Sequence, residues 1–163
     1  MDEYGVRSVA KGVLTHRGRV LLNRCRDDRY GDYYCLPGGG QEQYETLAEA
    51  VERELFEETG CRAHVVRFAA LYEDICDTPA ARQKFPKYAH KVYHIFACEL
   101  TGEEEAAPRD PDTSQLSCEW VPLEALPGTR ILPEAVAAAL PGIIAGKGPF
   151  FLGSEHYELD NIL

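Results

Sequence analysis

The segment from Thr46 to Thr59 constrains the fold of this chain more than any other, because its apolar residues repeat with helical spacing. Leu47, Val51 and Leu55 recur at every fourth position, which places them on one face of an α-helix. The threonine that opens the segment is suited to cap the first turn, and Gly60 is suited to end the last one. We therefore predict an amphipathic helix whose apolar stripe packs against the rest of the protein.

Three glutamates lie in the last turns of this helix. Glu54, Glu57 and Glu58 stand at i, i+3 and i+4, so their carboxylates share one face, which borders the apolar stripe. Like charges about 5 Å apart repel by roughly 3 kcal/mol per pair at an effective dielectric of 20. The cluster is either a solvated acidic face or a site for a hard cation, and the neighbouring run of three glycines favours the cation. Oxygen ligands alone select Mg²⁺ or Mn²⁺.

The rest of the chain predicts a mixed β-sheet flanked by helices, in one α/β domain over residues 1–163. Runs of apolar and β-branched residues predict strands at 6–15, 20–23, 33–36, 63–72, 91–100 and 119–121. An alanine-rich segment predicts a second helix at 132–145.

The remaining segments are interpreted as irregular. These are a charged loop at 24–32, a flexible glycine bend at 38–40, a proline-bearing loop at 77–88 and an acidic linker at 101–115. The tail from Lys147 onward shows no clear pattern.

The charge balance bears on partners. The chain carries 17 basic and 27 acidic residues, a formal net charge of −10. Such a charge repels polyphosphate backbones, which argues against a nucleic-acid partner. An enzyme that acts on anions would need cations to neutralise its own site.

Several absences bear on the compartment. No run reaches the roughly 18 apolar residues that span a bilayer, and the acidic N-terminal residues MDEYG do not match a signal peptide. The six cysteines form no C-x-x-C pair, and a disulfide framework is disfavoured without an export signal. We predict a cytoplasmic protein with reduced thiols and no membrane partner.

The stretch from Gly39 to Cys61, GGQEQYETLAEAVERELFEETGC, resembles the Nudix box, G-x5-E-x7-R-E-U-x-E-E-x-G-U, in which U is a bulky apolar residue. The matching residues are Gly39, Glu45, Arg53, Glu54, Leu55, Glu57, Glu58 and Gly60. The cysteine at the last apolar position is a mild departure. Seven fixed residues at about 7% each match a given window by chance on the order of once in 10⁸.

This resemblance implies the Nudix fold, an α/β/α sandwich around a mixed β-sheet. It also implies a hydrolase in which water attacks one phosphorus of a nucleoside diphosphate linked to another moiety, with Mg²⁺ or Mn²⁺ as cofactor. ADP-ribose-like compounds and nucleoside triphosphates are the main substrate candidates. A catalytically silent Nudix-like module that senses a nucleotide is the alternative. An RNA-decapping enzyme would need a basic groove, which the charge argues against. A homodimer is left open.

The resemblance also implies a metal site. Glu54, Glu57 and Glu58 would hold the cation together with the backbone of Gly38. Glu54 is our choice for the general base.

Five further residues receive supporting roles from the resemblance. Arg53 would orient its acidic neighbours, Glu45 would brace the turn into the helix, and Gly60 would end it. Gly39 and Gly40 would let the backbone approach the substrate phosphates closely.

Residues outside the box keep two interpretations each. Arg24 and Arg26 either contact substrate phosphate or are solvated. A further metal ligand from a later loop would fall at Gln115 or Glu119.

Aromatic and histidine clusters are also weighed. The tyrosines at 30, 33 and 34 either stack on a base or ribose, or fill a half-buried strand. His90 and His94 have the spacing of a zinc pair on a helix, but their segment has the pattern of a strand, so zinc is not predicted.

Overall fold

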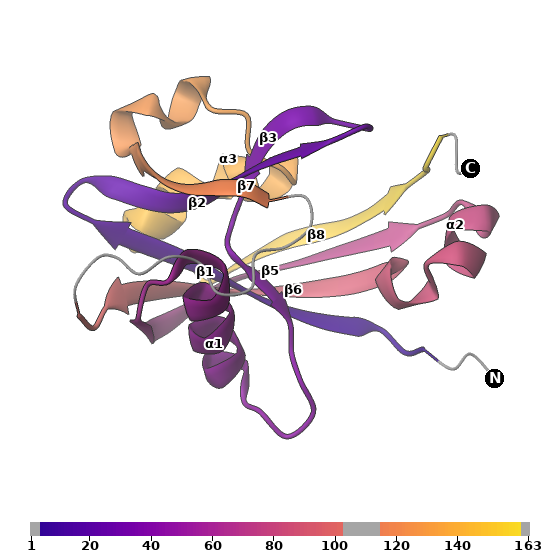
Figure 1. Ribbon diagram of the computed structural model, residues 1–163, viewed down its shortest axis with the longest axis horizontal. Helices are drawn as coiled ribbons and strands as arrows, with labels where there is room; N and C mark the ends of the chain where they lie inside the picture. The colour runs from indigo at the N-terminus through magenta and orange to yellow at the C-terminus, as the bar shows by residue number, and fades with distance from the viewer. Residues whose placement is uncertain (1–3, 103–114, 161–163) are drawn as a thin grey trace.

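The computed structural model describes residues 4–102 and 115–160, which form an eight-stranded β-sheet with helices on both faces (Figure 1). The strands are β1 (Arg7–His16), β2 (Arg19–Asp27), β3 (Gly31–Cys35), β4 (Gly38–Gly40), β5 (Ala63–Cys76), β6 (His90–Leu100), β7 (Gln115–Pro122) and β8 (Phe150–Tyr157). The helices are α1 (Leu47–Thr59), α2 (Pro79–Lys84) and α3 (Glu134–Ile144), with 3-10 turns η1 (Pro86–Tyr88) and η2 (Leu123–Gly128). Within these ranges no helix has the length and apolarity that crossing a membrane requires.

The sheet is mixed, as predicted. Six strands follow the order β3-β2-β1-β6-β5-β8, while β4 pairs with β1 and β7 pairs with β2. The pairs β1–β6 and β5–β8 are parallel, and the other pairs are antiparallel. The parallel register sets Arg7 beside Lys91 and Val9 beside Tyr93. Residues from distant parts of the chain therefore share one stretch of the sheet.

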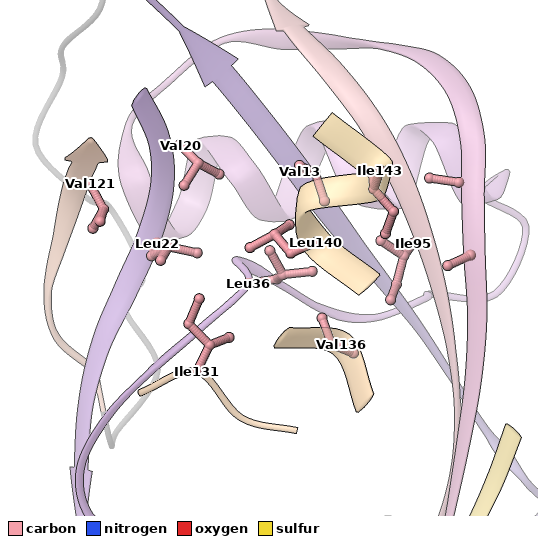
Figure 2. Packing of buried hydrophobic residues seen from close by; sticks show 12 residues of the cluster. Val13, Val20, Leu22, Leu36, Ile95, Val121, Ile131, Val136, Leu140 and Ile143 are labelled. Carbon is pink, nitrogen blue, oxygen red and sulfur yellow. The ribbon is translucent and has the colours of Figure 1, made fainter. Parts of the chain in front are cut away.

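Side chains along β1 point alternately to the two faces of the sheet and so contribute to two separate hydrophobic cores. Val13 packs on one face in a cluster with Ile95 of β6 and Leu140 of α3, and Figure 2 shows this cluster. Leu14 packs on the other face in a cluster with Leu55 of α1. Because each helix covers its own face of the sheet, the architecture is the α/β/α sandwich that the sequence led us to expect.

Helix α1 begins and ends as its sequence predicts. The backbone N–H of Glu49 donates to the Thr46 hydroxyl at 3.1 Å, and the backbone N–H of Thr46 donates to the Glu49 carboxylate at 2.7 Å, which completes a capping box. Gly60 ends the helix with a left-handed φ of 74°. Where α1 crosses β1, a Cβ on Gly12 would lie 3.0 Å from Cδ1 of Leu55. The missing side chain at Gly12 lets the helix lie close to the sheet.

Two segments near the glycine run differ from the prediction. The segment 24–32 is not a loop throughout: it contains the end of β2, a turn and the start of β3, because β2 pairs with β3 on one side and β7 on the other. Gly38–Gly40 is not a flexible bend but strand β4, whose backbone pairs with β1 from Val9 to Lys11. Long-range pairing overrides the weak local preference of charged and glycine residues for strands.

Three more segments lie away from the glycine run. The segment 77–88 contains α2 and η1 rather than a continuous loop, because its prolines occupy first turns, where the missing N–H has no helical partner to lose. The tail after Lys147 forms β8 beside β5. Of the expected linker, residues 103–114 lie outside the described residues, and Gln115 begins β7.

We expect Leu55→Ala to lower the free energy of unfolding by about 2–5 kcal/mol, because Leu55 is fully buried between α1 and the sheet. Urea denaturation followed by circular dichroism measures the change. Leu55→Met, which conserves volume, is the control and should cost less than about 1.5 kcal/mol. Equal losses in the two variants would show that volume at this contact does not determine how α1 docks.

Candidate active site

A cavity of about 580 Å³ lies along the sheet, and its size falls in the range of roughly 300–1,000 Å³ that is common for small-molecule sites. One part of its wall consists of Gly38–Gly40 and Glu58. Another part consists of side chains from β5, β6 and β8, among them Tyr72, Asp74 and Tyr93. The cavity therefore connects the end of α1, which we call the box helix, with a region rich in tyrosine.

Glu58 is the buried member of the glutamate cluster, with 6% of its surface exposed. Its Oε2 accepts hydrogen bonds from the backbone N–H of Gly38 and from Nδ2 of Asn23, both at 2.9 Å. Burial raises the pKa of Glu58, and the positive charge of Lys11 opposes that rise. These contacts fix the carboxylate in the cavity wall.

Arg53 connects the other two glutamates of the cluster to Glu45. Its guanidinium donates to both carboxylate oxygens of Glu45, at 2.7 and 3.0 Å. It also donates to Glu54 at 2.9 Å, to Glu57 at 3.1 Å and to the carbonyl of Gly40 at 3.0 Å. The hydrogen bonds from Arg53 lower the pKa of Glu45, whereas burial raises the pKa of Glu54. The guanidinium of Arg53 thus connects the box helix to β4, which we call the glycine strand.

The glycines of β4 pack closely against their neighbours. A Cβ on Gly39 would lie 2.7 Å from the carboxyl carbon of Glu54, and a Cβ on Gly40 would lie 2.5 Å from Nη2 of Arg7. Gly38 has a φ of 141°, and a Cβ there would overlap a backbone carbonyl of β1. A side chain at Gly38 would therefore meet backbone, whereas one at Gly39 or Gly40 would have to displace the end of the Glu54 or the Arg7 side chain.

The chemistry of these groups fits a hard divalent cation. Three carboxylates and the backbone carbonyls of β4 offer oxygen ligands, which Mg²⁺ and Mn²⁺ prefer. Across residues 4–102 and 115–160, no group of three or more acidic, His or Cys side chains is already arranged around a common point. One nitrogen of Arg53, Nη1, donates to both Glu54 and Glu57, so the guanidinium holds these two carboxylates. A metal ion would share these oxygens with the guanidinium.

The arginines expected to contact phosphate lie outside the cavity wall. On β2 the alternate residues Asn23 and Cys25 line the cavity, whereas Arg24 and Arg26 do not. Arg26 is exposed, and its Nε donates to Asp32 at 2.6 Å. A phosphate contact by either arginine would have to come from beyond this cavity.

Four other cations line the cavity, and the sequence analysis missed them. They are Arg7 and Lys11 on β1, Lys91 on β6, and Arg29 in the β2–β3 turn. Lys11 Nζ donates to the carbonyl of Gly38 at 3.0 Å. The spacing of Arg7 and Lys11 on one strand face was the available signal. Nothing in the local sequence sets Lys91 beside Arg7, because that depends on the parallel pairing of β1 and β6.

The two candidates for a later ligand lie in different places. Gln115 lines the cavity, and its Nε2 donates to the backbone carbonyl of Glu58 at 2.9 Å and to Oδ1 of Asn23 at 3.2 Å. Glu119 does not line the cavity, and it accepts a hydrogen bond from the Tyr34 hydroxyl at 2.8 Å. Of these two, Gln115 is the neighbour of the box helix.

The members of the tyrosine cluster and of the histidine pair have different surroundings in the fold. Tyr30 and Tyr33 line the cavity, whereas Tyr34 does not. His90 contacts a carboxylate of Glu73 at 2.9 Å. His94, also on β6, lies 3.2 Å from a backbone carbonyl of β1. Both histidines lie on β6, a strand that the sequence predicted, and each contacts a different partner.

Comparison with known proteins shows the family of this chain. The NUDIX domain family matches residues 6–142. RNA pyrophosphohydrolase of Bartonella henselae is 32% identical over 139 residues, which cover 77% of this chain and 80% of that protein. Phosphatase NudJ of Escherichia coli K12 is 35% identical over 89 residues, which cover 54% of this chain and 50% of that protein.

A solved structure shows the same fold. The NUDIX hydrolase from Nitrosomonas europaea is similar with a TM-score of 0.68 and 18% sequence identity, over 88% of this chain and 91% of that one. The family match spans most of the chain, and the box residues lie on the helix and glycine strand described above. On these grounds the chain belongs to the Nudix family.

Proposed function

We propose that this Nudix pyrophosphohydrolase cleaves the diphosphate linkage of a small nucleoside diphosphate derivative and depends on Mg²⁺ or Mn²⁺. The observation that supports this most is the complete set of box carboxylates beside β4, with Glu58 in the wall of a cavity of nucleotide size. A silent nucleotide-sensing module would not need all three acids. A divalent cation would offset repulsion among the three carboxylates beyond what the hydrogen bonds from Arg53 to Glu54 and Glu57 offset.

The proposed metal ligands are Glu54, Glu57, Glu58 and the backbone carbonyl of Gly38. A bound divalent cation offsets the negative charge of a diphosphate and lowers the pKa of a bound water. Glu54 is the proposed general base. Its carboxyl group lies against Gly39 of the glycine strand, beside the other proposed ligands.

The charge of the substrate is met by the cavity cations. Arg7 and Lys11 flank the glycine strand and are the proposed contacts for phosphate oxygens. Arg53 is a positioning residue, since it does not line the cavity itself and its hydrogen bonds hold Glu45, Glu54 and Glu57. An acidic protein can thus accept an acidic substrate through a local basic site.

The 5′ end of an RNA is the second substrate candidate. The similarity to a protein named RNA pyrophosphohydrolase favours it. The net charge of −10 opposes extended contact with an RNA backbone, so only the terminal phosphates and first nucleotide would enter the cavity.

A panel of substrates tests the proposed function. Phosphate release with a coupled phosphatase would be followed for nucleoside triphosphates, ADP-ribose, nucleotide sugars, dinucleoside polyphosphates and 5′-triphosphorylated RNA, with magnesium and with chelator. We expect magnesium-dependent turnover of a small nucleotide. Turnover of the RNA alone would transfer the assignment to the second candidate, and no turnover by folded protein would reject both.

Glu57→Gln should lower turnover at least roughly 100-fold, because one anionic metal ligand is lost. Glutamine keeps an oxygen acceptor for Arg53, so the melting temperature should change little. Steady-state kinetics across a magnesium titration provides the measurement. The matched control is Glu52→Gln on the same helix, which keeps the acceptor for the Val65 N–H and should retain wild-type turnover. Wild-type activity in Glu57→Gln would reject the metal assignment.

The pair of Glu45 and Arg53 should make stability depend on pH. Hydrogen bonds from Arg53 lower the pKa of Glu45 below its ordinary value of about 4.3, so the stabilisation is complete above that pH and is lost as the pH falls through the lowered folded-state pKa. We expect Glu45→Gln to cost about 1–2 kcal/mol at pH 7. The difference between variant and wild type in urea denaturation should shrink below about pH 4. A difference that stays constant from pH 7 to pH 3.5 would contradict this role.

A further inference from the structure

The end of the cavity away from the box helix has no role in the chemistry described so far. Its wall contains Tyr72 and Asp74 of β5, Lys91 and Tyr93 of β6, and Tyr157 of β8. We call this set the tyrosine end. Charged and aromatic groups of this kind, gathered in a cavity wall, are typical of ligand recognition.

The strand register places the tyrosine end beside the glycine strand and beyond it along β1. Gly40 pairs with Val9, which pairs with Tyr93, and Tyr93 pairs with Tyr72. Lys11 pairs with Gly38, and Arg7, four residues earlier on β1, pairs with Lys91. Lys91 pairs in turn with Asp74. At about 3.3 Å per residue, the row of Arg7 and Lys91 lies about 7 Å from Gly40 and about 13 Å from Gly38 along β1. A substrate whose diphosphate lies at the glycine strand would extend its organic part toward Asp74.

Asp74 has an incomplete set of hydrogen bonds. It is 7% exposed; its Oδ2 accepts from the Tyr93 hydroxyl at 3.0 Å and lies 3.5 Å from Nζ of Lys91. In the part of the chain that the structure describes, its Oδ1 is buried and has no hydrogen-bond partner. A buried acceptor without a donor is destabilising, and such groups are rare in folded proteins. Burial also raises the pKa of Asp74 and lowers the pKa of Lys91, so both groups are held away from water.

Aromatic rings limit what can donate to this carboxylate. The rings of Tyr72 and Tyr93 lie with centroids 5.5 Å apart and planes tilted by 39°. Arg29 lies over the rings of Tyr30 and Tyr157, at 4.5 and 5.4 Å from their centroids. Such walls favour a flat, conjugated group over a sugar ring, because planar rings stack on aromatic faces and cations.

We propose that Asp74 is a specificity-determining residue, which accepts an N–H of a nucleobase held at the tyrosine end. Lys91 donates to the carbonyl oxygen or ring nitrogen next to that N–H. This pairing of a donor with an adjacent acceptor is the Watson–Crick edge of a base, and it completes the hydrogen bonding of the carboxylate. The proposal rests on the proposed function, because the diphosphate at β4 sets the base at this end.

Equilibrium binding without metal tests the proposal separately from catalysis. Isothermal titration calorimetry would compare AMP, GMP, CMP and UMP with ribose 5-phosphate, which has no base. Wild-type protein should bind at least one nucleotide about tenfold or more tightly than ribose 5-phosphate, and the preferred nucleotide identifies the base. Asp74→Asn should bring that nucleotide to within about threefold of ribose 5-phosphate.

The matched control is Glu73→Gln, the preceding residue of β5, which contacts His90 and Ser154 outside the cavity and should keep the wild-type preference. A second measurement needs no variant: methylation that removes every N–H of the base donor (the ring N–H of guanine or uracil, or both hydrogens of the amino group of adenine or cytosine) should weaken wild-type binding by the same factor. Retention of the preference in Asp74→Asn, or equal binding of the methylated nucleotide, would overturn the proposal. So would wild-type protein that binds no nucleotide better than ribose 5-phosphate. A base preference that depends on Asp74, in protein without turnover, would reject the proposed function alone.

Discussion

The structure depends on the way in which three carboxylates are held on the last turns of α1 against the sheet. Their repulsion would push the helix away from the sheet or turn the carboxylates toward solvent. Two sets of contacts oppose this. Arg53 binds Glu54, Glu57 and Glu45 together, and the backbone N–H of Gly38 binds Glu58. Both sets include contacts to β4, and the glycines of this strand leave room for the Glu54 carboxylate and the Arg7 guanidinium.

The same constraint explains how the cavity is built. Because β4 pairs with β1, the cations on the facing side of β1 lie next to the glutamate cluster. The parallel pairing of β1 and β6 then continues the cavity toward Lys91 and Asp74. A chain with a net charge of −10 thus contains a local site with cations at both ends. Placing cations on strands keeps them fixed, so that little order has to be gained when an anion binds.

Local signals in the sequence predicted α1 well. Its apolar spacing, the capping threonine and the glycine at its end act within a few residues of one another, and the structure has each of them in place. Prediction was weaker where the partner of a segment lies far along the chain. The glycine strand has no strand-forming residues and is a strand only because β1 pairs with it. The end of β2 carries charges that indicate a loop, yet β3 and β7 pair with it.

The sequence by itself determined the box helix, the row of glutamates on its last turns and the class of fold, because periodicity, capping and a fixed motif are all local properties. Only the tertiary structure decided which side chains meet across the cavity. It excluded Arg24 and Arg26 from the cavity wall and brought in Lys11 and Lys91. It also buried Asp74 among tyrosines of three strands. The physical reason is that strand order and register are set by burial over the whole sheet, and a residue's face and neighbours follow from that register rather than from the residues beside it in sequence.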